Sequence, residues 1–173
     1  MFLDRDGVLV RAPVVAGRPH SIRDVADLVL EPGARAACEA LRADGLVLVG
    51  VTNQPDVARG LLAPGVLDAI HRRLLDQLPL VEMAVCPHDD ADACSCRKPL
   101  PGLLEEAASR LDLDLAASFM VGDRWRDVEA GRRAGCATVF VDREYSEPVP
   151  ENPGVIVRDV TEAAAWILER RRP

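Results

Sequence analysis

Short apolar runs alternate with helical patterns along the whole chain. Four runs are rich in β-branched residues and bounded by turn residues, which predicts buried β-strands after an apolar stub at residues 1–3. Between them, apolar positions recur every three or four residues with charged positions opposite, which is typical of amphipathic helices. The predicted strands span 47–52, 80–86, 119–121 and 137–141, and the predicted helices span 33–44, 66–78, 101–111, 125–134 and 161–171.

This alternation predicts a doubly wound α/β fold, in which a parallel sheet is covered by helices on both faces. The 173 residues contain no repeat and no linker that could divide two domains, so we expect one domain spanning residues 1–173. The excursion from Gly7 to Pro32 is too short for a large cap domain. In such sheets, functional loops gather at the carboxyl ends of the strands.

The charge balance narrows the class of partner. The chain has 28 acidic and 21 basic residues, a net charge of −7, which argues against nucleic acid and anionic membranes as partners. No run approaches the ~20 apolar residues of a membrane span, and no basic-then-apolar leader opens the sequence. We therefore expect a cytoplasmic protein that binds neither nucleic acid nor membrane, and we expect a monomer.

Two carboxylates follow the first apolar stub. Asp4 and Asp6 are two residues apart in an extended segment, so both side chains can face one ligand. Such a pair attracts a hard cation such as Mg²⁺, and one member can act as a covalent nucleophile. A lone Asp-x-Asp is more often a solvated turn with a capping aspartate.

Polar donors follow the next strand. Thr52, Asn53 and Gln54 offer a hydroxyl and two amides at its carboxyl end, where they suit phosphate oxygens. Taken alone, this triplet is better explained as an ordinary polar turn.

Two cations and a further carboxylate come later in the chain. Arg97 and Lys98 precede a predicted helix and could neutralise and grip a phosphoryl group. Asp123 follows the strand at 119–121, with Asp127 on the same helical face. A helix N-cap is the competing interpretation of Asp123.

The cysteines are unevenly distributed. Cys86 and His88 are followed after five residues by Cys94 and Cys96, which makes a complete Cys₃His set. A closed set of four such ligands predicts a structural Zn²⁺, because a catalytic zinc keeps one position open for water.

In this order, the motifs resemble the haloacid dehalogenase superfamily over roughly residues 1–145: nucleophile loop, Thr loop, lysine and acidic metal loop. With the cysteine set, they look like the branch that contains heptose-bisphosphate and histidinol-phosphate phosphatases. The resemblance implies Asp4 as nucleophile, Asp6 as general acid and base, and Thr52 and Lys98 as phosphoryl-stabilising groups. It implies that Mg²⁺ is held by Asp4, Asp6 and Asp123, with Asp6 using its backbone carbonyl.

The resemblance therefore implies a phosphatase that hydrolyses a small phosphorylated metabolite through an aspartyl-phosphate. We favour hydrolysis of heptose 1,7-bisphosphate at its 7-phosphate, because the second phosphate needs cations that Arg59, Arg97 and Arg124 could supply. We expect these arginines, with Asn53 and Gln54, to bind substrate.

Four alternatives stay open. The acidic run Asp89, Asp90 and Asp92 could instead attract the cationic amine of histidinol phosphate, or the substrate could be another sugar phosphate. A DNA 3′-phosphatase shares part of the pattern, but the acidic charge and the cysteine set argue against it. A non-catalytic, zinc-stabilised interaction module would not need Asp4, Asp6, Lys98 and Asp123 together.

Overall fold

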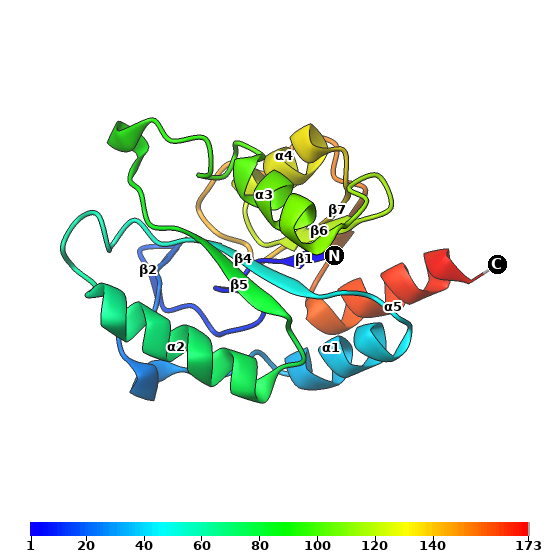
Figure 1. Cartoon of the computed structure of the whole chain (residues 1–173), viewed down its shortest axis with the longest axis horizontal. Coiled ribbons are helices and arrows are strands. Elements are labelled where there is room, and N and C mark those ends of the chain that lie inside the picture. The colour runs from blue at the N-terminus through cyan, green and yellow to red at the C-terminus, as the bar shows by residue number, and fades with distance from the viewer. Residues whose placement is uncertain (173) are drawn as a thin grey trace.

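The computed structural model describes residues 1–172 of the chain. Its central sheet has six parallel strands in the order β5-β4-β1-β6-β7-β8 (Figure 1). A separate antiparallel hairpin pairs β2 with β3. The strands are β1 (Phe2–Leu3), β2 (Val14–Val15), β3 (Arg18–Pro19), β4 (Val49–Asn53), β5 (Glu82–Cys86), β6 (Phe119–Gly122), β7 (Ala137–Val141) and β8 (Val155–Val157).

Helices cover both faces of the sheet, as the apolar strands require (Figure 1). Successive strand residues face opposite sides, so Leu3 packs with the core beneath α1, α2 and α5, whereas Phe2 packs with the core beneath α3 and α4. Within residues 1–172, no helix is long and apolar enough to cross a membrane. The helices are η1 (Val25–Asp27), α1 (Ala34–Ala43), α2 (Pro64–Gln77), η2 (Asp90–Asp92), α3 (Gly102–Leu111), α4 (Trp125–Ala134) and α5 (Val160–Arg171).

The predicted parallel sheet and its five helices are confirmed, whereas β8 and the β2–β3 hairpin were not predicted. Both are too short for a two-residue period to show. The hairpin also exposes Val14 and Val15, and it turns through Ala16 and Gly17 at positive φ. It lies in the excursion between Gly7 and Pro32 together with the short helix η1, and no cap domain is present there among the described residues.

The two-residue strand β1 lies at the centre of the sheet. It pairs with β4 on one side and β6 on the other, and the Asp4 backbone N–H extends this pairing by donating to Val121 O at 2.9 Å. Strand order reverses at β1, which leaves a crevice at the carboxyl ends of β1, β4 and β6. The predicted loops of Asp4, Thr52 and Asp123 lie there, and Lys98 comes from the segment between β5 and α3.

Candidate active site

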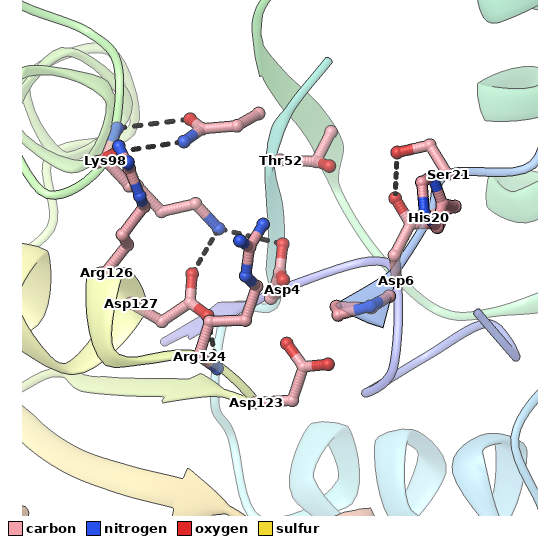
Figure 2. A pocket seen from close by; sticks show the side chains of 12 residues that line it. Asp4, Asp6, His20, Ser21, Thr52, Lys98, Asp123, Arg124, Arg126 and Asp127 are labelled. Carbon is pink, nitrogen blue, oxygen red and sulfur yellow. Dashed lines mark hydrogen bonds and ion pairs between the residues drawn. The ribbon is translucent and has the colours of Figure 1, made fainter. Parts of the chain in front are cut away.

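Three buried carboxylates and one buried ammonium group form the centre of this crevice (Figure 2). Carboxylate oxygens of Asp4, Asp123 and Asp127 lie within 4.8 Å of one another. Lys98 Nζ donates to Asp4 Oδ1 at 2.8 Å and to Val51 O at 3.0 Å, and it pairs with Asp127 Oδ1 at 2.5 Å. One cation is thus shared among three acids, so the cluster carries excess negative charge.

The electrostatics of the cluster reflect this imbalance. Burial and the neighbouring Asp127 raise the pKa of Asp4 from 3.8 to about 6, against the lowering effect of Lys98. Burial, Asp4 and Asp127 raise the pKa of Asp123 well above its usual range. Although burial by itself lowers the pKa of Lys98, Asp127 and Asp4 keep it above its usual value. Lys98 is therefore a permanent cation, and the carboxylates lack a second one.

Two glycines allow the loops to approach this closely. A Cβ at Gly7, where φ is +80°, would lie 1.9 Å from Asp123 Oδ2. A Cβ at Gly122 would lie 2.1 Å from Asp127 Cβ. Both distances are far inside van der Waals contact, so the positions of Asp123 and Asp127 depend on these glycines.

The Asp6 carboxylate points away from the acidic cluster and towards Ser21 (Figure 2). It accepts hydrogen bonds from Arg5 Nη2 at 2.8 Å, Gln54 Nε2 at 2.9 Å and Ser21 Oγ at 3.0 Å. It lines the same small cavity of about 50 Å³ as Asp4. The Asp6 carboxylate therefore faces the place where a substrate would bind and is not one of the three acids suited to a metal ion. The contact of Mg²⁺ with the Asp6 backbone carbonyl stays a prediction.

The three residues of the Thr52–Gln54 triplet make different contacts, which the sequence did not indicate. Gln54 is fully buried, so its predicted contact with substrate is wrong; its amide donates to Asp6 and, at 2.9 Å, to Thr52 Oγ1. Because Thr52 Oγ1 accepts this bond, its own proton is left to donate towards the cavity. Asn53 lines the cavity but binds the Lys98 backbone through both amide atoms, at 3.0 and 3.1 Å.

A larger hollow of about 350 Å³ adjoins the reaction centre and shares residues with it. Five arginines and three carboxylates line the hollow, which leaves a net charge of +2. The arginines include the three predicted to bind substrate, together with two that were not selected from the sequence: Arg18, Arg59, Arg97, Arg124 and Arg126.

The acidic run of the cysteine loop is already paired with these arginines. Asp89 receives two hydrogen bonds from Arg59, at 2.7 and 2.8 Å. Asp90 accepts from Arg97 at 2.7 Å and from Arg126 at 3.1 Å. Two of the three carboxylates that could have attracted a cationic substrate are thus neutralised by arginines, and the third, Asp92, accepts the Asp89 backbone N–H.

The cysteine set assembles in the segment between β5 and α3. Neighbouring donor atoms of Cys86, His88, Cys94 and Cys96 are 3.3–3.7 Å apart, with His88 contributing Nδ1. A tetrahedron with metal–sulfur bonds of about 2.3 Å has edges of roughly 3.8 Å, so the four atoms are spaced as zinc ligands would be. Arg97 and Lys98 follow Cys96 directly, so the Lys98 loop begins at this cluster.

Sequence reasoning missed three contributors to the site. Asp127 was noted for its helical face but not selected as a ligand, although its four-residue spacing from Asp123 was the available signal. His71 was not selected from the sequence; it is buried and its Nε2 lies 3.1 Å from Arg5 Nη1. Arg126 lines both cavities, and nothing in its local sequence marked it.

Comparisons with known proteins agree with this arrangement. A family model described as HAD-hydrolase-like matches residues 95–163. The D-glycero-beta-D-manno-heptose-1,7-bisphosphate 7-phosphatase of Bordetella bronchiseptica is 39% identical over 82% of this chain and 79% of its own. That of Pseudomonas aeruginosa is 32% identical over 98% of this chain and 97% of its own. The chain belongs to this family of haloacid dehalogenase-like phosphatases.

The three-dimensional similarity is equally extensive. The crystal structure of the D,D-heptose 1,7-bisphosphate phosphatase from B. bronchiseptica, complexed with magnesium and phosphate, superimposes with a TM-score of 0.84. It is 32% identical and the match covers 98% of both chains. As a member of this family, the chain is a phosphoric monoester hydrolase with the haloacid dehalogenase fold. The fold class and superfamily predicted from the motifs are thereby confirmed.

Proposed function

We propose that this chain removes the 7-phosphate of a heptose 1,7-bisphosphate, with Asp4 as the covalent nucleophile and Mg²⁺ as cofactor. The observation that carries the proposal is the buried Asp4–Lys98–Asp127 arrangement, opening onto a net-positive hollow beside it. The names of the relatives support the substrate class.

The acidic cluster suits a divalent cation. Asp123 is 2% exposed. The nearby Tyr145 hydroxyl lowers the pKa of its carboxyl somewhat. Even so, neither carboxylate oxygen of Asp123 makes a well-formed hydrogen bond among the described residues. Burying a charge without a partner is costly, so a cation bound by Asp4, Asp123 and Asp127 would satisfy it. When bound, Mg²⁺ would neutralise charge on the carboxylates and on the incoming phosphate.

The protein's own groups account for the chemistry. Lys98 holds Asp4 Oδ1, so Asp4 Oδ2 is the oxygen left to attack phosphorus and form the aspartyl-phosphate. Lys98 and Thr52 stabilise charge on the transferring phosphoryl group. Asp6 protonates the leaving alcohol and then takes a proton from the water that hydrolyses the aspartyl-phosphate, releasing phosphate and regenerating Asp4.

The hollow favours a bisphosphate over histidinol phosphate. A second phosphate needs cations away from the reaction centre. Arg97 and Arg126 share the single carboxylate of Asp90, so the adjoining hollow keeps positive charge that its own carboxylates do not balance. The amine of histidinol phosphate would need free carboxylates, but Asp89 and Asp90 are occupied by arginines. The charge pattern therefore supports the bisphosphate.

We also propose that Cys86, His88, Cys94 and Cys96 hold one structural Zn²⁺. Their spacing supports this, as does the lack of any disulfide among the described cysteines. The expected role is to fix the loop that carries Arg97 and Lys98, with no part in the phosphoryl transfer.

The substrate is tested by comparing kcat/KM for heptose 1,7-bisphosphate, heptose 7-phosphate and histidinol phosphate, because kcat/KM ratios report differences in transition-state binding. We expect the bisphosphate to be preferred by at least about tenfold, since one well-formed charged contact contributes about 1.5–3 kcal/mol. Arg97→Ala should remove most of that preference while leaving heptose 7-phosphate hydrolysis within about threefold of the wild type. Equal or better turnover of histidinol phosphate would contradict the assignment.

The nucleophile is tested separately. Asp4→Asn should abolish turnover of every substrate while the protein stays folded, because an amide cannot attack phosphorus. Phosphate release near the wild-type rate from this variant would exclude the covalent mechanism.

A further inference from the structure

Arg5, which separates the two predicted catalytic aspartates in the sequence, is a fully buried arginine. An arginine is almost never completely buried unless its guanidinium is paired and hydrogen-bonded, because its charge cannot be removed by deprotonation. Its partners here are specific: Nη2 and Nε donate to the Asp6 carboxylate at 2.8–3.2 Å. The third nitrogen, Nη1, turns to a different element and meets His71.

His71 connects this pair to helix α2, which otherwise contributes no residue to the reaction centre. Arg5 can only donate, so His71 Nε2 must be the acceptor across their 3.1 Å separation, and the imidazole is neutral with its proton on Nδ1. Burial and the charge of Arg5 lower the pKa of His71 to about 4, which keeps it neutral at physiological pH. A single stiff ring thus anchors the guanidinium to the scaffold.

Asp6 is held from three directions. Arg5 donates to it from the preceding position in the chain, Gln54 from the Thr52 loop and Ser21 from the segment after β3. Of these, Arg5 is the only charged donor and the only one whose side chain is tied to a helix. A catalytic acid has to be within hydrogen-bond reach of the atom it protonates, so its orientation limits its efficiency.

We propose that His71 and Arg5 are positioning residues that orient the carboxylate of Asp6 for proton transfer to the leaving alcohol. The proposal rests on the role of Asp6 in the proposed function. It does not depend on which phosphorylated metabolite is the natural substrate. Neither residue touches the substrate; His71 acts on Arg5, and Arg5 acts on Asp6.

The test compares leaving groups that differ in how much they need to be protonated by an acid. The sugar alcohol of an alkyl phosphate such as heptose 1,7-bisphosphate leaves as a strongly basic alkoxide unless an acid protonates it. Phenolate is a less basic leaving group than an alkoxide, and p-nitrophenolate is less basic still. Phenyl phosphate therefore depends less on an acid than the sugar phosphate does, and p-nitrophenyl phosphate depends on it least. We expect His71→Leu to lower kcat/KM for the sugar phosphate about 10–100-fold, which is part of the factor that a general acid supplies. Phenyl phosphate should lose an intermediate factor, and p-nitrophenyl phosphate less than about threefold.

Matched variants separate positioning from a loss of structure. His71→Gln places an amide oxygen near the position of Nε2 and should restore most of the sugar-phosphate activity. Ile70→Val alters the buried face of the same helix without removing a hydrogen bond to Arg5, and it should leave the ratio between the substrates unchanged. Arg5→Lys keeps a positive charge but loses the fork, so it should give the same leaving-group dependence as His71→Leu.

Two results would overturn the proposal. One is an equal loss for all three esters in His71→Leu, which would indicate a general structural role. The other is an unchanged ratio in both His71→Leu and Arg5→Lys while Asp6→Asn shows the leaving-group dependence. If Asp6→Asn itself lacks that dependence, the assignment of Asp6 as the acid in the proposed function is wrong.

Discussion

Replacement of Asp123 by asparagine should stabilise the metal-free protein while abolishing its response to Mg²⁺. Asp123 is buried beside Asp4 and Asp127, and neither of its carboxylate oxygens has a well-formed hydrogen bond among the described residues. An unsatisfied buried polar group costs about 1–3 kcal/mol, and more when it is charged. For scale, the rise in the pKa of Asp4 from 3.8 to about 6 corresponds to roughly 3 kcal/mol.

The expected change in the free energy of unfolding, and its dependence on pH, follow from the burial and the pKa shifts of these carboxyl groups. We expect Asp123→Asn to raise the free energy of unfolding by about 1–3 kcal/mol near neutral pH, because the charge is removed and the shape is kept. Asp4 and Asp123 have raised pKa values in the folded state, so between pH 3.8 and those values the folded protein binds more protons than the unfolded one. Stability of the metal-free wild type therefore falls as pH rises through this window, and the advantage of the variant should shrink at about pH 5.

The assay is urea unfolding with and without Mg²⁺. Exhaustive dialysis is preferable to a strong chelator, which would also remove zinc from the cysteine cluster. Saturating Mg²⁺ should stabilise the wild type by about 2.7 kcal/mol at one hundred times its Kd and leave Asp123→Asn unchanged. Asp68→Asn, an exposed change on α2, is the control and should alter neither quantity. A less stable metal-free Asp123→Asn, or a variant that still responds to Mg²⁺, would refute this reasoning.

Three further perturbations act at the edges of the site. Gly7→Ala, which forces a Cβ against Asp123, should weaken apparent Mg²⁺ affinity at least about tenfold in rate titrations; an unchanged affinity would contradict the close approach. Cys94→Ser should lower the zinc content found by elemental analysis. It should also reduce kcat/KM clearly while lowering the free energy of unfolding only slightly; wild-type zinc content would count against the ligand set. Glu147→Gln weakens the two hydrogen bonds that orient Arg124, so KM for the bisphosphate should rise about 3–10-fold with kcat nearly constant; a fall in kcat alone would be the contrary result.

The sequence by itself determined the sheet, the helices that cover it and most of the chemistry at the strand ends. A buried parallel strand must be apolar on both faces and an amphipathic helix must repeat every three to four residues, so both leave a local signature. The strand predicted at 137–141 and the helix predicted at 125–134 have the bounds that the structure shows. Asp4 and Asp123 could be located for the same reason, since each follows a recognisable strand.

Tertiary structure alone decided how the polar groups are partnered. Lys98 reaches Asp4 across 94 positions of the chain, and Arg5 reaches His71 across 66. No local pattern records such pairings, because a side chain's partner depends on which strands are neighbours in the sheet. For the same reason, Gln54 was predicted to bind substrate but lies buried against Asp6. The acidic loop residues Asp89 and Asp90 are neutralised by arginines from two different loops and from helix α4. Residue types set which chemistry was possible, and long-range packing set which groups remain available to perform it.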